Sequence, residues 1–378
     1  MKIKKIFYVA NVNLFSGKAN AIQLAKMCEA LIGQGIDLTL VIPKRLKTQK
    51  SVREFYGLSR DISLVRLPFF GFFLQSSIGF NVAAFSFMIT SFLFLVWKKV
   101  TGEDFLIYTI DLDQFSYAFL PLIAPTVLEV HGSKKKNVFL QFFFARLSGF
   151  FAVSEHVRQS IINTFSFQGP SLTLPNGIDL EVFGPERNRA VIETPALERP
   201  IFLYSGRAYA WKGIKTIVEA LDRNKNLKAV FVGGSKEELE SVLHTSVPET
   251  LISVGRRPFT EIPSWLAWAD VFLVGGTAKD RYSFFETSPM KLFEYLAYGK
   301  PIVAVDSPAI REIVNENEVT FFKPDDPADL ARAMRFVKEH YSELLKRSEM
   351  LKEKAKQYSW KKRVEKVINF MKFLITNF

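Results

Sequence analysis

Two glutamates, Glu286 and Glu294, stand with seven residues between them in the stretch ETSPMKLFEYLAYGKP. A carboxylate accepts hydrogen bonds and therefore suits the vicinal hydroxyls of a sugar. On a helix that starts at Pro289, Glu294 begins roughly 7–8 Å along the axis, at 1.5 Å per residue. That is about the offset between a diphosphate and its attached ribose. The spacing predicts that Glu294 accepts hydrogen bonds from a ribose while Glu286 faces the far side of the phosphates.

A helix must position these carboxylates, and the residues between them predict one over Pro289–Tyr298. Ser288 can cap it by accepting a hydrogen bond from an unpaired backbone N–H. Pro289 suits the first turn, where its missing N–H costs nothing. Gly299 can take the left-handed conformation that ends a helix, and Pro301 prevents its resumption. The free N–H groups and the dipole at the helix start favour an anion there.

A second source of positive charge follows the predicted strand Ile201–Ser205. Gly206 allows close backbone approach, and Arg207 and Lys212 place two cations on one loop. Strand ends of one parallel sheet face the same crevice, so these cations are expected to meet Lys291 and the helix start around a phosphate. The alternative is an ordinary capped helix with two surface glutamates, beside a basic surface loop.

Composition places the chain among folded globular proteins, with 378 residues, 48% hydrophobic and 23% charged. The length allows two domains with sizeable cores. The single cysteine, Cys28, excludes an intramolecular disulfide and is compatible with a reducing compartment. The net charge of +12 is spread over both halves without a recognised nucleic-acid module. We therefore expect no nucleic-acid partner, and a surface that faces anionic lipid or phosphate-bearing substrates.

Short apolar strands alternate with helical patterns along the chain, which predicts parallel sheets covered by helices. A proline- and charge-rich linker over 184–200 separates two such series, so we expect two successive Rossmann-like halves. The strands predicted in the first half are Ile6–Ala10, Leu38–Ile42, Phe105–Thr109, Thr126–Val130 and Phe150–Val153. Those predicted in the second are Ile201–Ser205, Ala229–Val232, Leu251–Val254, Val271–Val274 and Ile302–Val305.

The stretch Ile78–Trp97 holds twenty residues without a charge and ends at Lys98 and Lys99. Its length reaches the threshold for a transmembrane helix. It lies between two predicted strands of one sheet, where a covering helix is expected. We therefore predict a buried or partly membrane-facing helix, and a true span as the alternative. Phe142–Phe144, beside Lys134–Lys136, could also touch a lipid interface or pack in the core.

The second half resembles the C-terminal domain of family 4 retaining glycosyltransferases, which have the two-domain GT-B fold. The matching segments are YSGRAYAWKGIKTIVEAL, VGRRPFTEIPSWLAWADVFLV and ETSPMKLFEYLAYGKPIVAVDSPAIREIV, and the glutamates reproduce the family's E-x7-E signature. In the first half, LEVHG, FAVSEHV and LPNGIDLEVF resemble family segments. The resemblance implies two Rossmann-like domains facing each other across a cleft.

That resemblance implies an acceptor-binding domain over residues 1–185 and a nucleotide-sugar-binding domain over 186–355. A C-terminal helix over 356–378 is expected to pack back toward the first domain. Implied catalytic residues are Glu286, His131, Arg207 and Lys212. Implied donor-binding residues are Gly17, Gly206, Arg207, Lys212, Gly255, Arg256, Ser288, Pro289, Met290, Lys291 and Glu294.

Two departures from the family pattern bear on these roles. The first loop carries Gly17 and Lys18 where members often have paired glycines, and Thr287 replaces the usual glycine after Glu286. The pair Asp111 and Asp113 is similar to the metal-binding D-x-D of the other major glycosyltransferase fold. We expect no metal there, because cations of the second half already face the diphosphate.

The expected activity is metal-independent transfer of a sugar, with retention, from a nucleotide diphosphate sugar to a hydroxyl acceptor. The acceptor is expected to be a saccharide or a lipid-linked one, in cell-surface polysaccharide or glycolipid biosynthesis. The nucleotide sugar is then a substrate, and no cofactor is expected. We expect a cytoplasmic protein, with peripheral attachment to the inner face of the membrane left open. The alternatives are another GT-B enzyme such as an epimerase, and a non-catalytic scaffold subunit.

Overall fold

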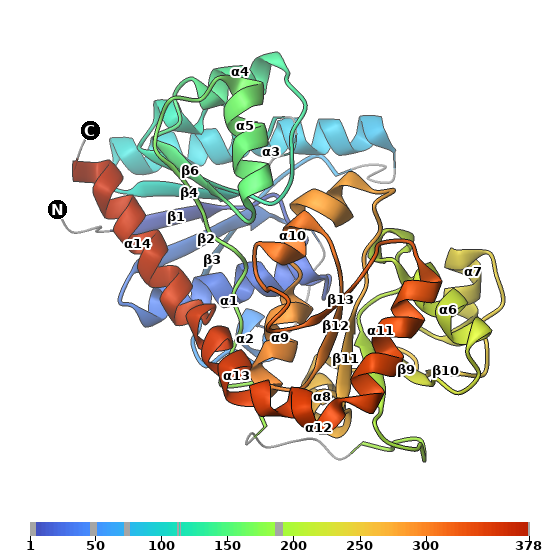
Figure 1. Cartoon of the computed structure of the whole chain (residues 1–378). Helices are drawn as coiled ribbons and strands as arrows, with labels where there is room; N and C mark the ends of the chain where they lie inside the picture. The colour runs from blue at the N-terminus through green and yellow to red at the C-terminus, as the bar shows by residue number, and fades with distance from the viewer. Residues whose placement is uncertain are drawn as a thin grey trace. The chain divides into compact units, whose positions relative to one another are not determined.

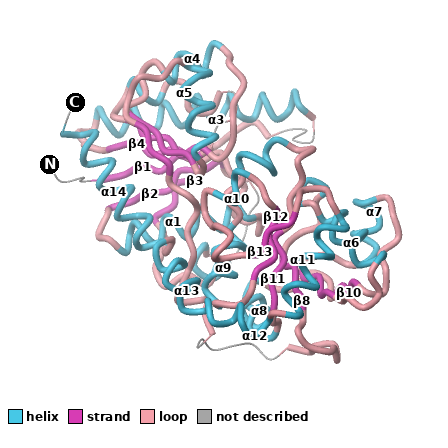
Figure 2. Tube along the Cα trace, in the orientation of Figure 1, coloured by secondary structure: helices cyan, strands magenta, loops and turns pink. Residues whose placement is uncertain are grey.

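Two parallel β-sheets form the framework of the chain, and Figure 2 draws their strands in magenta. The computed structural model describes residues 5–45, 51–71, 76–111, 113, 115–185 and 192–376. Contacts divide the chain into an N-terminal unit, Met1–Pro175 with Trp360–Phe378, and a C-terminal unit, Asn176–Ser359. The predicted linker 184–200 lies partly outside the described residues, as does the predicted boundary at residue 186. The final segment from Trp360 belongs to the N-terminal unit.

The N-terminal unit is built on a seven-stranded sheet in the order β3-β2-β1-β4-β5-β6-β7, with every pair parallel. Helices α3, α4 and α5 lie on one face of this sheet, and α1 and α14 lie on the other (Figure 1). Its elements are β1 (Lys5–Val9), α1 (Ala19–Gly33), β2 (Asp37–Pro43), α2 (Val52–Tyr56), β3 (Ser63–Leu67), α3 (Ser77–Val100), β4 (Leu106–Ile110), η1 (Leu120–Leu122), β5 (Thr126–Val130), α4 (Val138–Phe144), β6 (Gly149–Ala152), α5 (Glu155–Phe165), β7 (Ser171–Thr173) and α14 (Trp360–Thr376).

The C-terminal unit repeats the design with six parallel strands in the order β10-β9-β8-β11-β12-β13. Helix α11 packs on α6, and α13 packs on α9. Its elements are β8 (Phe202–Ser205), η2 (Ala210–Lys212), α6 (Ile214–Arg223), β9 (Ala229–Val232), α7 (Lys236–Leu243), β10 (Leu251–Ser253), η3 (Phe259–Glu261), α8 (Ile262–Trp268), β11 (Val271–Val274), η4 (Tyr282–Glu286), α9 (Met290–Tyr298), β12 (Ile302–Val305), α10 (Pro308–Arg311), β13 (Thr320–Phe322), α11 (Pro327–Glu339), α12 (Tyr341–Leu344), η5 (Leu345–Arg347) and α13 (Ser348–Gln357).

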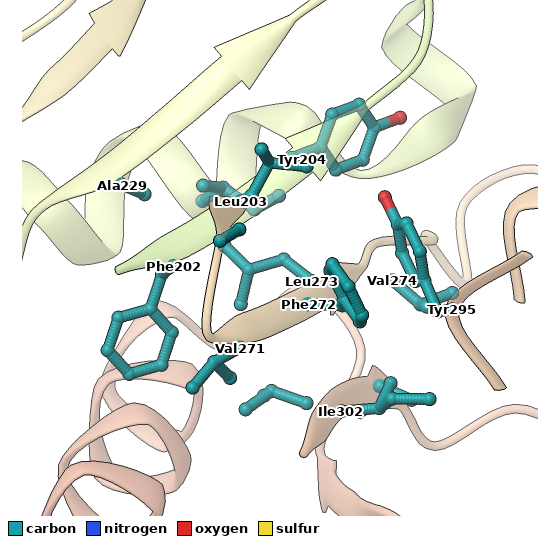
Figure 3. Close-up of a cluster of buried hydrophobic side chains, with 14 of the residues drawn as sticks. Phe202, Leu203, Tyr204, Ala229, Val271, Phe272, Leu273, Val274, Tyr295 and Ile302 are labelled. Atoms are coloured by element: carbon teal, nitrogen blue, oxygen red, sulfur yellow. The ribbon is translucent and has the colours of Figure 1, made fainter. Parts of the chain in front are cut away.

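The core of the C-terminal unit explains why α9 stays close to the sheet. Tyr295 of α9 stacks on Phe272 of β11, with ring centroids 4.4 Å apart (Figure 3). Such aromatic pairs contribute about 0.5–1.5 kcal/mol beyond their buried area. The Tyr295 hydroxyl also accepts a hydrogen bond of 2.8 Å from the backbone N–H of Ser205, the last residue of β8. One side chain thus joins the helix to two neighbouring strands.

Helix α3 is the one helix of the described chain that is long and apolar enough to cross a membrane, over Ile78–Val100. Its inner face packs into the core, where Phe87 and Leu95 meet Phe7 of β1 in a single cluster. The predicted covering helix is therefore present, and 44% of its most apolar stretch is buried in the unit.

Candidate active site

The site of the C-terminal unit forms where the strand order reverses, between β8 and β11. Ligands of open parallel sheets bind outside the carboxyl ends of the strands at such a point. The loop after β8 holds the predicted residues Gly206, Arg207 and Lys212, and the loop after β11 holds Gly275 and Gly276. The topology therefore brings the predicted phosphate loop to the expected edge of the sheet.

Glycines let these two loops pack against each other. A Cβ on Gly213, whose φ is +67°, would lie 2.2 Å from the backbone oxygen of Gly276. A Cβ on Gly275 would lie 2.5 Å from the carbonyl oxygen of Lys212. Real Cβ atoms do not approach backbone this closely, so only glycine fits here. The backbone carrying Lys212 is held directly against the end of β11.

Helix α9 begins at Met290, with Pro289 before it, and ends at Gly299, whose φ is +64°. The predicted helix and its glycine stop are confirmed. The predicted cap is wrong, because no side chain caps α9 and the Ser288 hydroxyl accepts instead from the backbone N–H of Asn176 at 3.0 Å. The Asn176 side chain in turn donates to the Ser288 carbonyl at 2.8 Å. The first N–H groups of α9 are thus left without a side-chain acceptor.

Two lysines converge beside this helix end. A Cβ on Gly206, whose φ is +143°, would lie 3.0 Å from Lys291 Nζ and 3.6 Å from Lys212 Nζ. The Lys291 ammonium lies 3.5 Å from the centroid of the Tyr204 ring, a cation–π contact. Among the described residues, neither lysine nor Arg207 has a carboxylate partner within ion-pair distance. Three cations therefore share one place without a direct ion pair, and Glu294 attracts Lys291 from a greater distance.

The pKa values of these groups reflect their burial and the close approach of like charges. Burial, together with the Arg207 charge, lowers the pKa of Lys212 to about 8. Burial and the neighbouring Lys212 hold the pKa of Lys291 well below its usual value. Burial also raises the pKa of the Glu294 carboxyl to about 7, against the attraction of Lys291. A bound dianion would reverse the like-charge effect on both lysines.

Glu286 ends a π-helical turn, η4, and is 4% exposed. Its Oε1 accepts from Arg281 Nε at 2.9 Å. The loop before it is held by Asp325, which accepts from the Thr277 hydroxyl at 2.6 Å and from the Ala278 N–H at 2.9 Å. Glu286 therefore sits on a fixed backbone, next to the start of α9.

The predicted nucleobase loop lies at the end of β10. Gly255 has a φ of +76°, and its carbonyl accepts from the Gly233 N–H at 2.9 Å. Arg256 forms an ion pair of 2.7 Å with Glu238 of α7. Arg257 donates to the Val254 carbonyl. Both arginine side chains thus have protein partners, so the backbone of Gly255 is the part of this loop left for a base.

In the N-terminal unit, His131 follows β5 and lies beside the buried Glu129. The distance from His131 Nε2 to Glu129 Oε1 is 2.8 Å, and Gln23 Nε2 donates to the same oxygen at 2.7 Å. Because a carboxylate only accepts, the contact with Glu129 favours a proton on Nε2 of His131, although Gln23 Nε2 also lies 3.0 Å from that nitrogen. Arg363 of α14 donates to this carboxylate at 2.6 Å. Burial opposes ionisation of Glu129, yet Arg363 and His131 hold its pKa low, at about 2.

The remaining predicted residues of this unit lie on loops after β1 and β4. Gly17 has a φ of +60° and open space where a Cβ would stand. Asp111 forms an ion pair of 2.5 Å with Lys134. Asp113 accepts from the N–H groups of Phe115 and Ser116. Asp113 therefore closes its own turn, and the described residues hold no group of three or more side chains suited to a metal.

Sequence reasoning missed the buried network around Glu129. A glutamate inside the apolar strand TVLEV was a signal that a buried partner must exist. Nothing in the sequence identified Arg363, 234 positions away, as that partner. The contact of Lys291 with the Tyr204 ring had no sequence signal either.

Comparison with known proteins gives a consistent result. A glycosyltransferase from Rickettsia africae has a TM-score of 0.75 at 16% identity, covering 99% of this chain and 100% of that one. A sucrose-phosphate synthase from Thermosynechococcus elongatus gives the same values. Anabaena HepE, in complex with UDP, has a TM-score of 0.70 at 16% identity, covering 97% and 99%. No match was found among curated proteins.

These likenesses, at such low identity, establish the fold, which is GT-B over nearly the whole chain. The family model of glycosyl transferases group 1 matches residues 186–358. That range coincides almost fully with the C-terminal unit, which holds Arg207, Lys212, Glu286 and Glu294. The C-terminal unit of this GT-B chain therefore matches the glycosyl transferases group 1 family over almost all of its length.

Proposed function

We propose that the protein transfers a sugar from a nucleotide diphosphate donor to a hydroxyl acceptor, with retention and without a metal ion. The observation that carries the proposal is the group of Arg207, Lys212 and Lys291 beside the open start of α9. Like charges are gathered at a cost unless an anion neutralises them. A diphosphate supplies the missing negative charge, and the helix end supplies N–H donors for its oxygens.

In this proposal the cations stabilise the diphosphate as it leaves, which is the largest electrostatic task of the reaction. Glu294, one helical turn into α9, accepts from the ribose hydroxyls. Glu286 accepts from hydroxyls of the transferred sugar, held in place by Arg281. His131, held beside Glu129, is proposed to contact the donor sugar or phosphate.

Anabaena HepE, one of the structural neighbours, is known in complex with UDP-glucose, which supports a nucleotide-sugar donor. We propose no particular nucleobase, because Gly255 offers backbone groups that any base could contact. We propose a saccharide or lipid-linked acceptor, in cell-surface polysaccharide or glycolipid synthesis at the cytoplasmic side of the membrane. The net charge of +12 and the apolar helix α3 support that location.

The decisive experiment measures binding and hydrolysis of UDP-, GDP- and ADP-sugars by the wild type and two variants. Lys212→Ala and Glu294→Ala should each lower turnover by about 10²-fold or more, because they remove donor contacts made at the reacting diphosphate and ribose. Lys215→Ala is the matched control. This lysine is exposed on the same helix-loop segment and should retain full activity. Near-normal turnover in either site variant would overturn the assignment.

Three further measurements separate the finer claims. Product anomer by NMR tests retention, and inversion would contradict it. Turnover in excess EDTA tests metal independence, and complete loss would show that a divalent ion is required. An epimerised nucleotide sugar, formed from the donor without any acceptor, would favour an epimerase. Failure to bind any nucleotide of the panel would favour a scaffold subunit.

A further inference from the structure

We propose that one face of the N-terminal unit, formed by α3 and α4, docks on an anionic lipid bilayer. Helix α3 presents a continuous stripe of large apolar side chains to solvent. The stripe consists of Ile78, Val82, Phe85, Ile89, Leu93, Trp97 and Val100, which are 43–80% exposed. Spacings of three and four residues put them on one side of the helix. The stripe spans about 33 Å at 1.5 Å per residue.

This stripe is additional to the face that α3 buries. The inner face contributes Phe87 and Leu95 to the core of the unit, and Phe94 packs edge-on against Phe7 of β1 with centroids 5.7 Å apart. A covering helix normally turns a polar face to water. Helix α3 is apolar on both sides, so its outer face is unsuited to water alone.

Helix α4 extends the same surface. Rings connect the two helices: Phe85 meets Phe115, and Phe115 meets Phe139 of α4, with centroids 6.3 and 5.1 Å apart. Val138 at the start of α4 is 75% exposed. A shallow hollow of about 530 Å³ lies along α4, lined by Lys136, Asn137, Val138, Gln141, Phe142 and Ala145. The hollow is open enough to receive part of an acyl chain.

The charges around this face are positive. No acidic residue occurs in the sequence from Ser76 to Gly102 or from His131 to Ser154. Lys98 and Lys99, at the end of α3, are paired with Glu103 and Asp104 and add little net charge. Lys135 and Lys136 precede α4, are exposed, and have no ion-pair partner in the described chain. Arg146, just after α4, is also exposed and lies 3.9 Å from the Phe142 ring centroid.

A lipid surface fits this combination better than a second copy of the chain does. Apolar side chains flanked by lysine and arginine match the acyl boundary and the anionic headgroups of a bilayer. A symmetric dimer through this face would bring the same cations of both copies together. A transmembrane position does not fit, since Phe87 and Leu95 would have to leave the core. The helix therefore lies in the plane of the membrane surface.

The test uses the full chain and vesicles of phosphatidylcholine with or without phosphatidylglycerol. We expect sedimentation with the anionic vesicles, several-fold weaker binding to the neutral ones, and release by high salt. Trp97, 56% exposed on the stripe, should shift its emission to the blue on binding and be quenched by brominated lipid. Trp97→Phe should remove that shift while binding persists.

Two variants test the two parts of the surface. Ile89→Glu/Leu93→Glu should weaken vesicle binding by at least about tenfold, because it places charges in the apolar stripe. Lys135→Glu/Lys136→Glu should remove the preference for anionic lipid. Met350→Glu, at a comparably exposed apolar residue of α13, is the control and should bind as the wild type does.

Far-UV circular dichroism is measured in parallel to show that each variant is folded. The proposal does not depend on sugar transfer, so vesicle binding can succeed where donor turnover fails. The proposal would be overturned if the wild-type protein did not bind anionic vesicles and instead dimerised through the stripe. Resistance to extraction by alkaline carbonate would also overturn it, because it would mean that α3 is inserted across the bilayer.

Discussion

Lys212 is a residue whose charge can change just above neutral pH. Its pKa of about 8 comes from burial and from Arg207, and a bound diphosphate would raise it again. The contribution of Lys212 to donor affinity should therefore be complete below pH 8 and be lost as the pH rises above it. The loss should reach up to about tenfold between pH 8 and 9. Titration calorimetry with the best-binding nucleotide sugar measures it.

The control for this prediction keeps the charge at all pH values. Lys212→Arg should bind with an affinity that falls less steeply above pH 8, because a guanidinium does not titrate there and only Lys291 still does. Glu294 titrates at a lower pH than Lys212 does, because its pKa is about 7. Donor affinity should therefore also fall below pH 7, as the carboxylate is protonated. A wild-type affinity that is constant from pH 6 to 9 would contradict both roles.

Lys291 offers a second residue-scale prediction, in which function and stability oppose each other. This ammonium is desolvated, lies over the Tyr204 ring and has no carboxylate partner within ion-pair distance in the described chain. Lys291→Met should raise the free energy of unfolding of the unliganded protein by about 1–2 kcal/mol, since it removes an uncompensated charge. The same change should abolish the thermal shift caused by UDP.

Lys300 is a matched contrast for that experiment. Its ammonium donates to the carbonyls of Leu266, Ala267 and Ala269 and is therefore well satisfied. Lys300→Met should destabilise the protein, because three acceptors lose their donor. Thermal unfolding with and without UDP distinguishes the two lysines. If Lys291→Met is less stable than the wild type, the ammonium is a structural group rather than an anion ligand.

At the scale of elements, the last helix is tied to the first sheet through a buried charge pair. Arg363 of α14 and Glu129 of β5 are 2% and 0% exposed, and their side chains are 2.6 Å apart. Arg363→Ala leaves a buried carboxylate without its cation and should cost about 3–5 kcal/mol. Lys361→Ala, exposed at the start of the same helix, should stay within about 0.5 kcal/mol of the wild type. Urea unfolding measures both.

A double variant separates the charge from the packing. Glu129→Gln/Arg363→Met removes both charges and should be more stable than Arg363→Ala alone. If the two are equally unstable, the cost arises from packing of α14. The pH dependence has a defined sign: the pKa of Glu129 is depressed in the fold. Its contribution is therefore present above about pH 4.3 and lost as the pH falls toward 2.

The elements that sequence reasoning found are those with strong local signals. Helix α9 was bounded correctly because Gly299 and Pro301 mark its end, and strands such as Val271–Val274 are continuous apolar runs. Strands β3, β7 and β13 were missed. β7 and β13 are three residues long, and all three lie at sheet edges, so their partners define them more than their composition does.

The residues of the candidate site fall into the same two groups, those that local sequence patterns predict and those that they do not. Arg207, Lys212 and Glu294 could be predicted, because a glycine turn after a strand and a spaced pair of glutamates are local patterns. The bond between Ser288 and Asn176, and the support of His131 by Glu129 and Arg363, join residues more than a hundred positions apart or in different elements. Such contacts depend on tertiary packing, which no local pattern encodes.

For the whole molecule, the path of the chain makes the C-terminal unit an insertion within the N-terminal one. The chain leaves the N-terminal unit after Pro175 and returns at Trp360. The two ends of the insertion are adjacent, because the Ile178 N–H donates to the Tyr358 carbonyl at 2.9 Å. The N-terminal unit, by contrast, is discontinuous and needs α14 to neutralise Glu129.

This asymmetry predicts that segment 176–359 folds and binds nucleotide alone, whereas segment 1–175 does not fold. The C-terminal unit has its own large core, and all three cations of the proposed donor site lie within it. Its affinity for UDP should stay within about tenfold of the full chain, with no sugar transfer, because the segment lacks His131, a proposed catalytic residue. Circular dichroism and calorimetry test this, with Glu294→Ala in the same segment as the control. A folded segment that fails to bind UDP would show that the donor site requires residues of the N-terminal unit.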